Sequence, residues 1–563
     1  MATGMKAAVK QPEDVNGSGG DDVPFDPSMW RDYFITYTAP LSQARTEEWM
    51  RARAETLTGE VRRTMLDVAG DANDDSSAAA MLVDTLERLG LDGHFRQEIG
   101  AAMGRLCREV ASDRDDLHTV ALRFRLLRQH GLRVSADVFD KFREGSGDFS
   151  PSLRNDSRGL LSLYNAAHTA TPNEASLNYA IAFARRHLEA MKDELTPPMA
   201  KQVSRALDIP LPRFPRRHET MNYLAEYEKE DEHNSMLLEL ARLDFDLARS
   251  LHLKELKTLS MWWRELYDSV KLSYARDRLV ESYLWICGVF HEEDYSRARI
   301  MFAKFFGLLS LMDDTYDVHA TLDECFKLNE AIQRWDESAV SILPKYLRVF
   351  YIKLLNNFNE LEDSLEPHEK YRISYTRNAF KLSSEYYLRE AKWSNENYAP
   401  SFAEQLEVSS MSSYPLLAPA MLMGVGDDGV ATAEAFEWAA AVPDMISASG
   451  EVARFLNDIA SHVVRKSKKD VPSTVECYMA EHGMDGEAAV AAVAALAERA
   501  WRTINRAFLE MDPSLLPAAR LIVNLTKMLE VIYLGGGDVY TFGDGLKGLI
   551  SSLFLKPAIV YTQ

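Results

Sequence analysis

Apolar residues recur at three- and four-residue spacing along most of the chain. In the first half the pattern is clear in segments such as 46–69 and 174–191, which Gly, Pro and Asp-Asn breaks separate from their neighbours. From Leu237 onward the apolar runs are longer, and the alanine-rich segment 487–501 has high helix propensity. This spacing predicts amphipathic helices. The sequence has no long alternating β pattern and no solenoid-type repeat, so we predict an all-α protein.

Two features divide the chain. Residues 1–23 carry a Gly-Ser-Gly-Gly run and few apolar side chains, so we expect a disordered tail there. The acidic run 226–232 is typical of a solvated helix face and lies near a change in the helical pattern. Because 563 residues exceed what one hydrophobic core usually supports, we predict two helical domains, at residues 24–235 and 236–563.

The composition narrows the classes of function. A formal net charge of −21 repels nucleic acid and anionic lipid, so we expect neither as a general partner. The four cysteines lie far apart, which favours reduced thiols over a disulfide framework. The first 23 residues resemble neither a secretory signal nor an acid-poor transit peptide, and no apolar stretch is long enough for a transmembrane segment. We therefore expect a monomeric cytoplasmic protein.

The first candidate site is the acidic sequence DDTYD at residues 313–317. On a helix, Asp313 and Asp317 share a face one turn apart, so their carboxylates can hold Mg²⁺ jointly. The same pattern also occurs at the solvated end of an ordinary acidic helix. Residues 305–312 are apolar almost all round, which favours the end of a buried helix. Carboxylates in such a place need cations or hydrogen-bond donors.

A second polar set occurs later in the chain, directly after two apolar residues. Asn457 and Ser461 share a helical face and offer neutral oxygen atoms that Mg²⁺ accepts. Three arginines lie near the two polar sets in the sequence, namely Arg276, Arg278 and Arg454. Each of them taken singly is more often a surface ion-pair residue. Because guanidinium groups match phosphate oxygens, their joint placement beside two metal-binding sets predicts a diphosphate ligand.

The order of these motifs resembles the terpene synthase family, in particular its cytosolic sesquiterpene-forming branch in flowering plants. The resemblance covers nearly the whole chain. Its motifs are PFDPSMWRDYF at 24–34, YEKED at 227–231, LDF at 243–245, WW at 262–263, RDR at 276–278, DDTYD at 313–317, EAKW at 390–393, NDIAS at 457–461 and VECYM at 475–479. It implies two helical barrels, with the active site in the second. It also implies ionisation of a prenyl diphosphate, release of diphosphate, and a carbocation cascade ended by deprotonation or water capture.

The resemblance further implies a cluster of three Mg²⁺ ions, with Mn²⁺ as an alternative metal. The residues expected to bind metal are Asp313, Asp317, Asn457 and Ser461. The residues expected to support these ligands without touching the metal are Asp314 and Asp458. The residues expected to hold the departing diphosphate are Arg276, Arg278 and Arg454.

Other motifs are similar to the walls of the family's pocket. Trp285 matches a tryptophan whose π face stabilises a carbocation, and we expect it on one helix with Arg276. Pro415 is expected to break a helix beside the pocket, next to Ser412, Ser413 and Tyr414. Residues 533–545 are expected to form a loop that closes over the site, with Tyr533, Asp538 and Tyr540 as its functional residues. An ordinary core tryptophan and an ordinary surface loop are the competing interpretations.

Two positions depart from the family pattern. A glutamate that normally completes the second metal motif is replaced by Arg465, which removes a ligand and adds a permanent positive charge. Either Arg465 binds diphosphate directly, or the protein is a weak or catalytically silent relative that only binds diphosphate. The tandem arginine of monoterpene-forming relatives is replaced by Gly20 and Asp21.

We therefore expect farnesyl diphosphate as the substrate, which makes the protein a sesquiterpene synthase. A monoterpene synthase using geranyl diphosphate is the alternative. A chain-elongating prenyl diphosphate synthase is disfavoured, because only one of its two aspartate-rich motifs is present.

Overall fold

The computed structural model describes residues 25, 28–38, 46–63, 76–108, 115–144, 147–413, 415–426, 429–462 and 471–558. The predicted tail at 1–23 lies outside these residues, as do Tyr414 and Arg465. The described residues are almost entirely helical and contain no strand beyond an isolated bridge between Arg143 and Phe149. The prediction of an all-α protein is confirmed.

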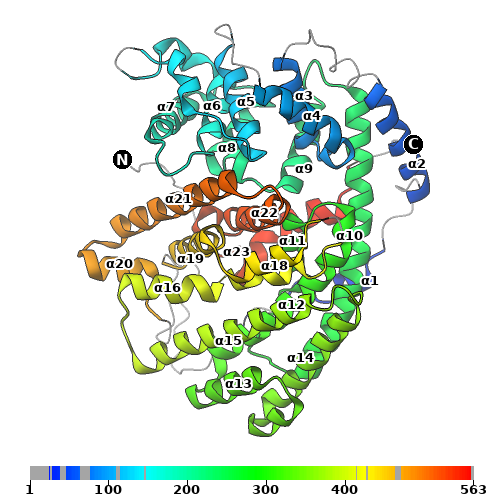
Figure 1. The fold of residues 1–563 in the computed structure, drawn as a ribbon, viewed down its shortest axis with the longest axis vertical. Helices are drawn as coiled ribbons and strands as arrows, with labels where there is room; N and C mark the ends of the chain where they lie inside the picture. Colours follow the sequence, from blue (N-terminus) through cyan, green and yellow to red (C-terminus); the bar gives the residue numbers. More distant parts are fainter. Residues whose placement is uncertain are drawn as a thin grey trace.

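The amino-terminal helices form the upper part of the molecule in Figure 1, except for α1, which lies below the others. They are α1 (Tyr33–Thr36), α2 (Glu47–Val61), α3 (Ser76–Arg88), α4 (Arg96–Arg108), α5 (Leu117–Gln129), α6 (Ser157–Ala167), α7 (Ala175–Met191), α8 (Met199–Asp208) and α9 (Arg216–Tyr227). Polar side chains fix several of their starts. Thr46, for example, accepts a hydrogen bond from the backbone N–H of Trp49 at 3.2 Å and so caps α2.

The carboxy-terminal helices are more numerous and include the longest ones. They are α10 (Ser235–Val270), α11 (Leu279–Val289), α12 (Ser296–Asp314), α13 (Leu322–Arg334), α14 (Lys345–Asp363), α15 (Arg372–Glu396), α16 (Phe402–Ser413), α17 (Ala418–Leu422), α18 (Ala433–Ala440), α19 (Asp444–His462), α20 (Thr474–His482), α21 (Gly486–Glu510), α22 (Leu516–Ile532), α23 (Val539–Phe542) and α24 (Lys547–Ile550). Ser473 and Glu476 form a reciprocal capping box that starts α20.

Short 3₁₀ and π turns connect these helices. The 3₁₀ turns are Asp92–Phe95, Ala136–Phe142, Pro151–Asn155, Leu211–Arg213, Glu293–Tyr295, Glu337–Ile342, Pro415–Leu417, Leu534–Gly536 and Asp544–Leu546. The π turns are Thr315–His319 and Ser551–Leu555. Among the described residues, none of the helices combines the length and the apolar character needed to cross a membrane.

Helix α10 joins the two parts of the fold. It contacts α2 on one side and α11, α12 and α14 on the other, and it runs along one edge of both parts in Figure 1. Its first residue, Ser235, is the last residue of the predicted amino-terminal domain, and the exact boundary stays a prediction. The fold has the predicted two helical domains.

The hydrophobic cores do not follow the order of the chain. Helices α5 to α8 enclose one core, which includes Leu160, Leu177 and Val203. Residues from α1 to α4, by contrast, share a single core with helices of the carboxy-terminal part. Helices α21 and α22 lie across the middle of the view in Figure 1, between α5 to α8 above them and most of the other carboxy-terminal helices below them. The amino-terminal helices therefore support the carboxy-terminal domain by direct packing.

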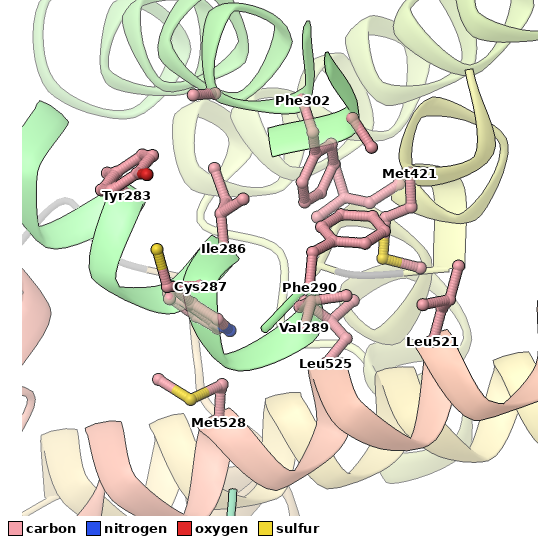
Figure 2. Packing of buried hydrophobic residues seen from close by; sticks show 14 of the residues in the cluster. Tyr283, Ile286, Cys287, Val289, Phe290, Phe302, Met421, Leu521, Leu525 and Met528 are labelled. Atoms are coloured by element: carbon pink, nitrogen blue, oxygen red, sulfur yellow. The ribbon is translucent and has the colours of Figure 1, made fainter. Parts of the chain in front are cut away.

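The contact between α11 and α22 places an important helix of the site. Figure 2 shows Met528 and Leu525 of α22 facing Cys287 and Val289 of α11. A Cβ atom on Gly288 would lie only 2.1 Å from the sulfur of Met528, so a larger residue there would require the Met528 side chain to move. This close approach fixes the position of α11 deep in the core.

Candidate active site

The acidic motif lies at the end of a buried helix. Helix α12 ends at Asp314, and the chain continues as a π turn over Thr315–His319 that carries Asp317. We call Asp313, Asp314 and Asp317 the aspartate wall. Asp314 is buried, Asp313 is partly buried and Asp317 is exposed. The sequence predicted the buried helix, but not its change to π geometry, a feature that is frequent at functional sites.

Arg276 binds two members of the aspartate wall. Its guanidinium lies 2.6 Å from an Asp313 carboxylate oxygen and 2.8 Å from one of Asp314. Its backbone N–H also donates to Asp314 at 2.7 Å. Arg276 lies in the connection between α10 and α11, so the expectation that it shares a helix with Trp285 is wrong. The tertiary bond to Asp314 holds this backbone outside the helix.

Loss of solvation and neighbouring carboxylates raise the pKa values of three acidic residues in the site. Loss of solvation raises the pKa of Asp313, and the Arg276 guanidinium only partly offsets this rise. The pKa of Asp317 is raised well above its usual value by loss of solvation and then by the nearby charges of Asp313 and Glu390. Burial likewise raises the pKa of Glu390, on α15, to about 7. These carboxylates need a positive partner in order to be charged together.

Helix α19 carries the second polar set, and we call Arg454, Asn457, Asp458 and Ser461 the α19 wall. The Arg454 guanidinium donates to the Asn457 side-chain oxygen at 3.2 Å and to Asp458 at 3.4 Å. Asp458 in turn accepts two hydrogen bonds from Thr474, both 2.7 Å long. The hydroxyl of Ser461 donates to the Asp458 carbonyl at 3.3 Å. Since the charge of Arg454 also lowers the pKa of Asp313, the two walls act on one another.

A broken helix connects the two walls. Helix α16 ends at Ser413, and a 3₁₀ turn begins at Pro415. Ser412 donates to a Glu390 carboxylate oxygen at 3.1 Å, while the Ser413 hydroxyl accepts from Arg454 at 2.9 Å. The break therefore bonds to α15 on one side and to α19 on the other.

Aromatic rings line the interior next to the aspartate wall. The ring of Trp285 lies 5.7 Å from that of Tyr540 and 5.9 Å from that of Phe306, both measured between centroids. The Tyr540 hydroxyl lies 3.0 Å from the Ser282 hydroxyl, which fixes the tyrosine ring. The Arg276 guanidinium lies 5.8 Å from the centre of the Tyr540 ring. Tyr540 thus connects the aromatic surface to the arginine.

The carboxy-terminal segment 533–545 is not the plain loop that we expected. It contains 3₁₀ turns and the short helix α23, which Asp538 caps by accepting from the backbone N–H groups of Tyr540 and Thr541, each at 3.0 Å. Arg278 is buried and donates to the Thr541 carbonyl at 3.0 and 3.1 Å. Tyr533 accepts a hydrogen bond from the Asn457 amide at 3.1 Å. The segment is thereby attached to both walls.

Two residues at the site had no predicted role. Glu390 lies in the EAKW sequence that carried the family resemblance, yet its position opposite the aspartate wall depends on how α15 packs. Thr541 follows Tyr540, and its hydroxyl accepts from Arg276 at 3.3 Å. A buried carboxylate on an otherwise neutral helix face could have identified Glu390, whereas no local signal identifies Thr541.

The protein side chains alone do not complete a metal site. Among the described residues, no three His, Cys, Asp or Glu side chains converge closely enough to hold a metal ion. Asp313 is already paired with Arg276. Any ion bound here would therefore need further oxygen ligands, from water or from a bound anion.

Known proteins share both the sequence and the fold. The family model for the metal binding domain of terpene synthases matches residues 264–503, and the model for the terpene synthase N-terminal domain matches residues 29–207. A eudesmanediol synthase of Zea mays is 57% identical over 96% of this chain and 97% of its own length. A tau-cadinol synthase of Zea mays is 42% identical over 94% of this chain and 97% of its own length.

Among solved structures, isoprene synthase from grey poplar leaves (Populus x canescens) has been determined with three Mg²⁺ ions and dimethylallyl-S-thiolodiphosphate. It matches with a TM-score of 0.82 and 31% identity over 90% of this chain and 97% of its own. The family models, the relatives and the helical architecture agree, and the chain belongs to the terpene synthase family.

Proposed function

We propose that this protein is a sesquiterpene synthase that ionises farnesyl diphosphate and releases diphosphate from it. The observation that carries the proposal is the crowded carboxylate cluster of Asp313, Asp317 and Glu390, with Arg276 and Arg454 beside it. It is supported by relatives whose names are those of sesquiterpene synthases, among them tau-cadinol synthase. Acid groups that need cations, placed next to arginines, suit a metal-bound diphosphate.

The donor set fits Mg²⁺, with Mn²⁺ as the alternative. Magnesium is usually bound through one or two carboxylates together with substrate phosphates, which suits a site that is incomplete without a further molecule. Asp313 and Asp317 would hold two ions, and Asn457 and Ser461 the third, with Asp314 and Asp458 keeping these side chains in place. When bound, the metal supplies electrostatic stabilisation of the negative charge that develops on the leaving group. The poplar structure with three Mg²⁺ ions supports this number.

The arginines divide into two roles. Arg276 and Arg454 have guanidinium groups next to the acidic cluster and are the candidates for holding the leaving diphosphate. Arg278 donates to the Thr541 carbonyl and so positions the segment that carries Tyr540. Its predicted contact with diphosphate stays a proposal. Tyr533 and Asp538 fix the two ends of that segment, which would keep water from the reacting carbon atoms.

The aromatic surface suits a carbocation. Trp285, Phe306 and Tyr540 form a set of neighbouring rings, and a ring face attracts a desolvated cation by about 2 kcal/mol. Ser412 and Ser413 end α16 at the break before Pro415, where carbonyl groups freed from the helix can face the same cation, and Tyr414 stays a proposed pocket residue from the family resemblance. These residues would shape the folding of the chain-like substrate.

We further propose that the cascade ends in water capture and gives a hydroxylated sesquiterpene. The specific support is the similarity to eudesmanediol synthase, whose name is that of a diol, at 57% identity over 96% of this chain. Deprotonation to a hydrocarbon is the competing outcome. The location and the assembly are also proposals: none of the four cysteines forms a disulfide, which suits a reducing compartment such as the cytoplasm, and we propose a monomer.

A product assay tests this proposal. The purified protein is incubated separately with farnesyl diphosphate and geranyl diphosphate, with and without Mg²⁺, and the extracts are analysed by gas chromatography and mass spectrometry. We expect Mg²⁺-dependent sesquiterpene alcohols from farnesyl diphosphate at a higher kcat/KM than any product from geranyl diphosphate. The reverse preference would support the monoterpene alternative, and no product with either Mg²⁺ or Mn²⁺ would favour the silent relative.

A further inference from the structure

A large cavity lies between the two parts of the fold. Its volume is about 530 Å³, within the roughly 300–1,000 Å³ that is typical of small-molecule sites. Residues such as Arg96 and Arg216 line it from the amino-terminal helices, and Arg520 and Lys527 line it from α22. None of the candidate active-site residues contributes to its lining.

The acidic groups of this cavity are already engaged. Glu87 lies 2.6 Å from the His130 ring and 3.9 Å from the Arg216 guanidinium. Asp92 lies 3.7 Å from the same guanidinium. Two further wall arginines have partners outside the lining, Arg128 with Glu174 and Arg213 with Glu498. Glu292, the third acidic residue of the lining, lies 3.5 Å from the His291 ring.

Three cationic side chains of the wall have no ion pair within the described part of the chain, namely Arg96, Arg520 and Lys527. Arg520 and Lys527 are seven residues apart on α22, so they share one face of that helix. Burial and then the positive charge of Arg216 lower the pKa of Lys527 to about 7. Arg96 and Arg520 are exposed and Lys527 is partly buried, and they share the wall with Glu87, Asp92 and Glu292.

The remaining lining residues include an apolar part of the wall. Trp501 and Phe508 of α21 form an apolar part of the wall beside the cations. An adjoining face of α22 packs on α11 through Leu525 and Met528, as Figure 2 shows. Asn524 belongs to the cavity and also donates to the Val289 carbonyl at the end of α11, at 3.1 Å. The cavity and the surface that contacts α11 thus meet at Asn524, although the lining contains none of the candidate active-site residues.

We propose that this interdomain cavity is a binding site for a small phosphate-bearing anion, held mainly by Arg520 and Lys527 with Arg96 and Arg216 around it. Guanidinium and ammonium groups that lack a counter-ion form strong charge-assisted hydrogen bonds with phosphate oxygens. The proposal concerns a second site and does not depend on the proposed catalytic function.

Inorganic diphosphate is the first probe, and inorganic phosphate and sulfate are compared with it. Binding to the full-length protein is measured by isothermal titration calorimetry in Mg²⁺-free buffer, so that metal-dependent binding at the aspartate wall does not contribute. The double variant Arg520→Gln/Lys527→Gln is compared with the control Lys257→Gln/Lys370→Gln, which removes the same charge from exposed positions. We expect the cavity variant to weaken diphosphate binding at least about tenfold, while the control stays within about twofold of the wild type.

Further variants separate the possible outcomes. Asp317→Asn should retain the binding, and Arg520→Lys/Lys527→Arg, which keeps both charges, should retain most of it. The single variants Arg520→Gln and Lys527→Gln give the same comparison if the double variant does not fold. Equal affinity of the cavity variant and the control, or no binding to the wild type, would overturn the proposal.

Discussion

The two walls of the active site differ in how their polar groups are satisfied. On the aspartate wall, loss of solvation and neighbouring carboxylates raise the pKa of Asp313 and Asp317, and Arg276 is their main compensating charge. On the α19 wall, Asp458 accepts two hydrogen bonds from Thr474, and Arg454 spreads its donors over Ser409, Ser413, Asn457 and Asp458. The aspartate wall lacks enough positive charge to balance its carboxylates, whereas the polar groups of the α19 wall already have hydrogen-bond partners.

This difference indicates which wall of the active site binds metal first. The aspartate wall is the part that needs a cation before its acids can ionise together, because unpaired buried charge is costly. The α19 wall offers neutral oxygens and a guanidinium that is held in place. Binding of metal should therefore begin at the aspartate wall, with the α19 wall contributing once an anionic substrate is present.

Loss of a carboxylate from the aspartate wall should have the largest effect. We expect Asp317→Asn to lower kcat by about 10³-fold, because removing a group that stabilises developing charge costs roughly 3–4 kcal/mol. Steady-state release of diphosphate from farnesyl diphosphate measures it. Asp323→Asn, at a largely exposed carboxylate on α13, is the matched control and should leave kcat unchanged. A similar loss in both variants would show that Asp317 has no special role.

Loss of the guanidinium on the α19 wall should cost less. We expect Arg454→Gln to lower kcat/KM by about 10²-fold, since a hydrogen bond to a charged group contributes about 1.5–3 kcal/mol. The same kinetic assay measures this, with circular dichroism to verify folding. An effect larger than that of Asp317→Asn would reverse the ranking of the two walls.

Glu281 is a buried carboxyl outside the aspartate wall, so it tests the effect of burial on a pKa without metal binding. It is buried on α11, and burial raises its pKa to about 7 from 4.5. The folded protein thus binds this proton more tightly than the unfolded chain does, so its contribution to stability is present below about pH 4.5 and is lost as the pH rises towards 7. Between pH 5 and pH 8 we expect Glu281→Gln to gain about 2–3 kcal/mol of stability relative to the wild type.

Thermal unfolding at the two pH values, without metal, measures this difference. Addition of Mg²⁺ should not change it, because Glu281 lies outside the aspartate wall. A difference between variant and wild type that is the same at both pH values would show that this carboxyl does not titrate as described.

Restoring a carboxylate at position 465 should alter the third metal position. We expect Arg465→Glu to lower the Mg²⁺ concentration for half-maximal rate by about tenfold, because it replaces a positive charge with an oxygen ligand. The rate as a function of Mg²⁺ concentration provides the test, and Lys466→Glu, at the next position, is the charge control. An unchanged Mg²⁺ dependence would show that Arg465 does not act on the metal site.

Removal of the cap on α23 should have the smallest effect. We expect Asp538→Ala to cost about 1 kcal/mol of local stability, the usual effect of losing an N-cap. Because this loosens the segment that carries Tyr540, the fraction of water-derived products should change while kcat falls less than about tenfold. Product analysis measures the fraction, and an unchanged distribution would indicate that the segment does not control access of water.

The sequence predicts the parts of the site that depend on local spacing. Helical periodicity was sufficient for an all-α fold, and the apolar run before Asp313 indicated a buried helix end. Long-range packing decides the rest. The Arg276–Asp314 bond and the placement of Glu390 join segments that no periodicity relates. For the same reason, the shared core of α1 to α4 with the carboxy-terminal helices was not predicted.

The most direct test of the account is the melting temperature of the substrate-free protein at pH 8, with and without Mg²⁺. If the crowded carboxylates around Asp317 bind the metal, Mg²⁺ should raise the melting temperature of the wild type and of Asp323→Asn by about 2–4 °C, and that of Asp317→Asn by much less. No rise in the wild type, or an equal rise in Asp317→Asn, would contradict the account.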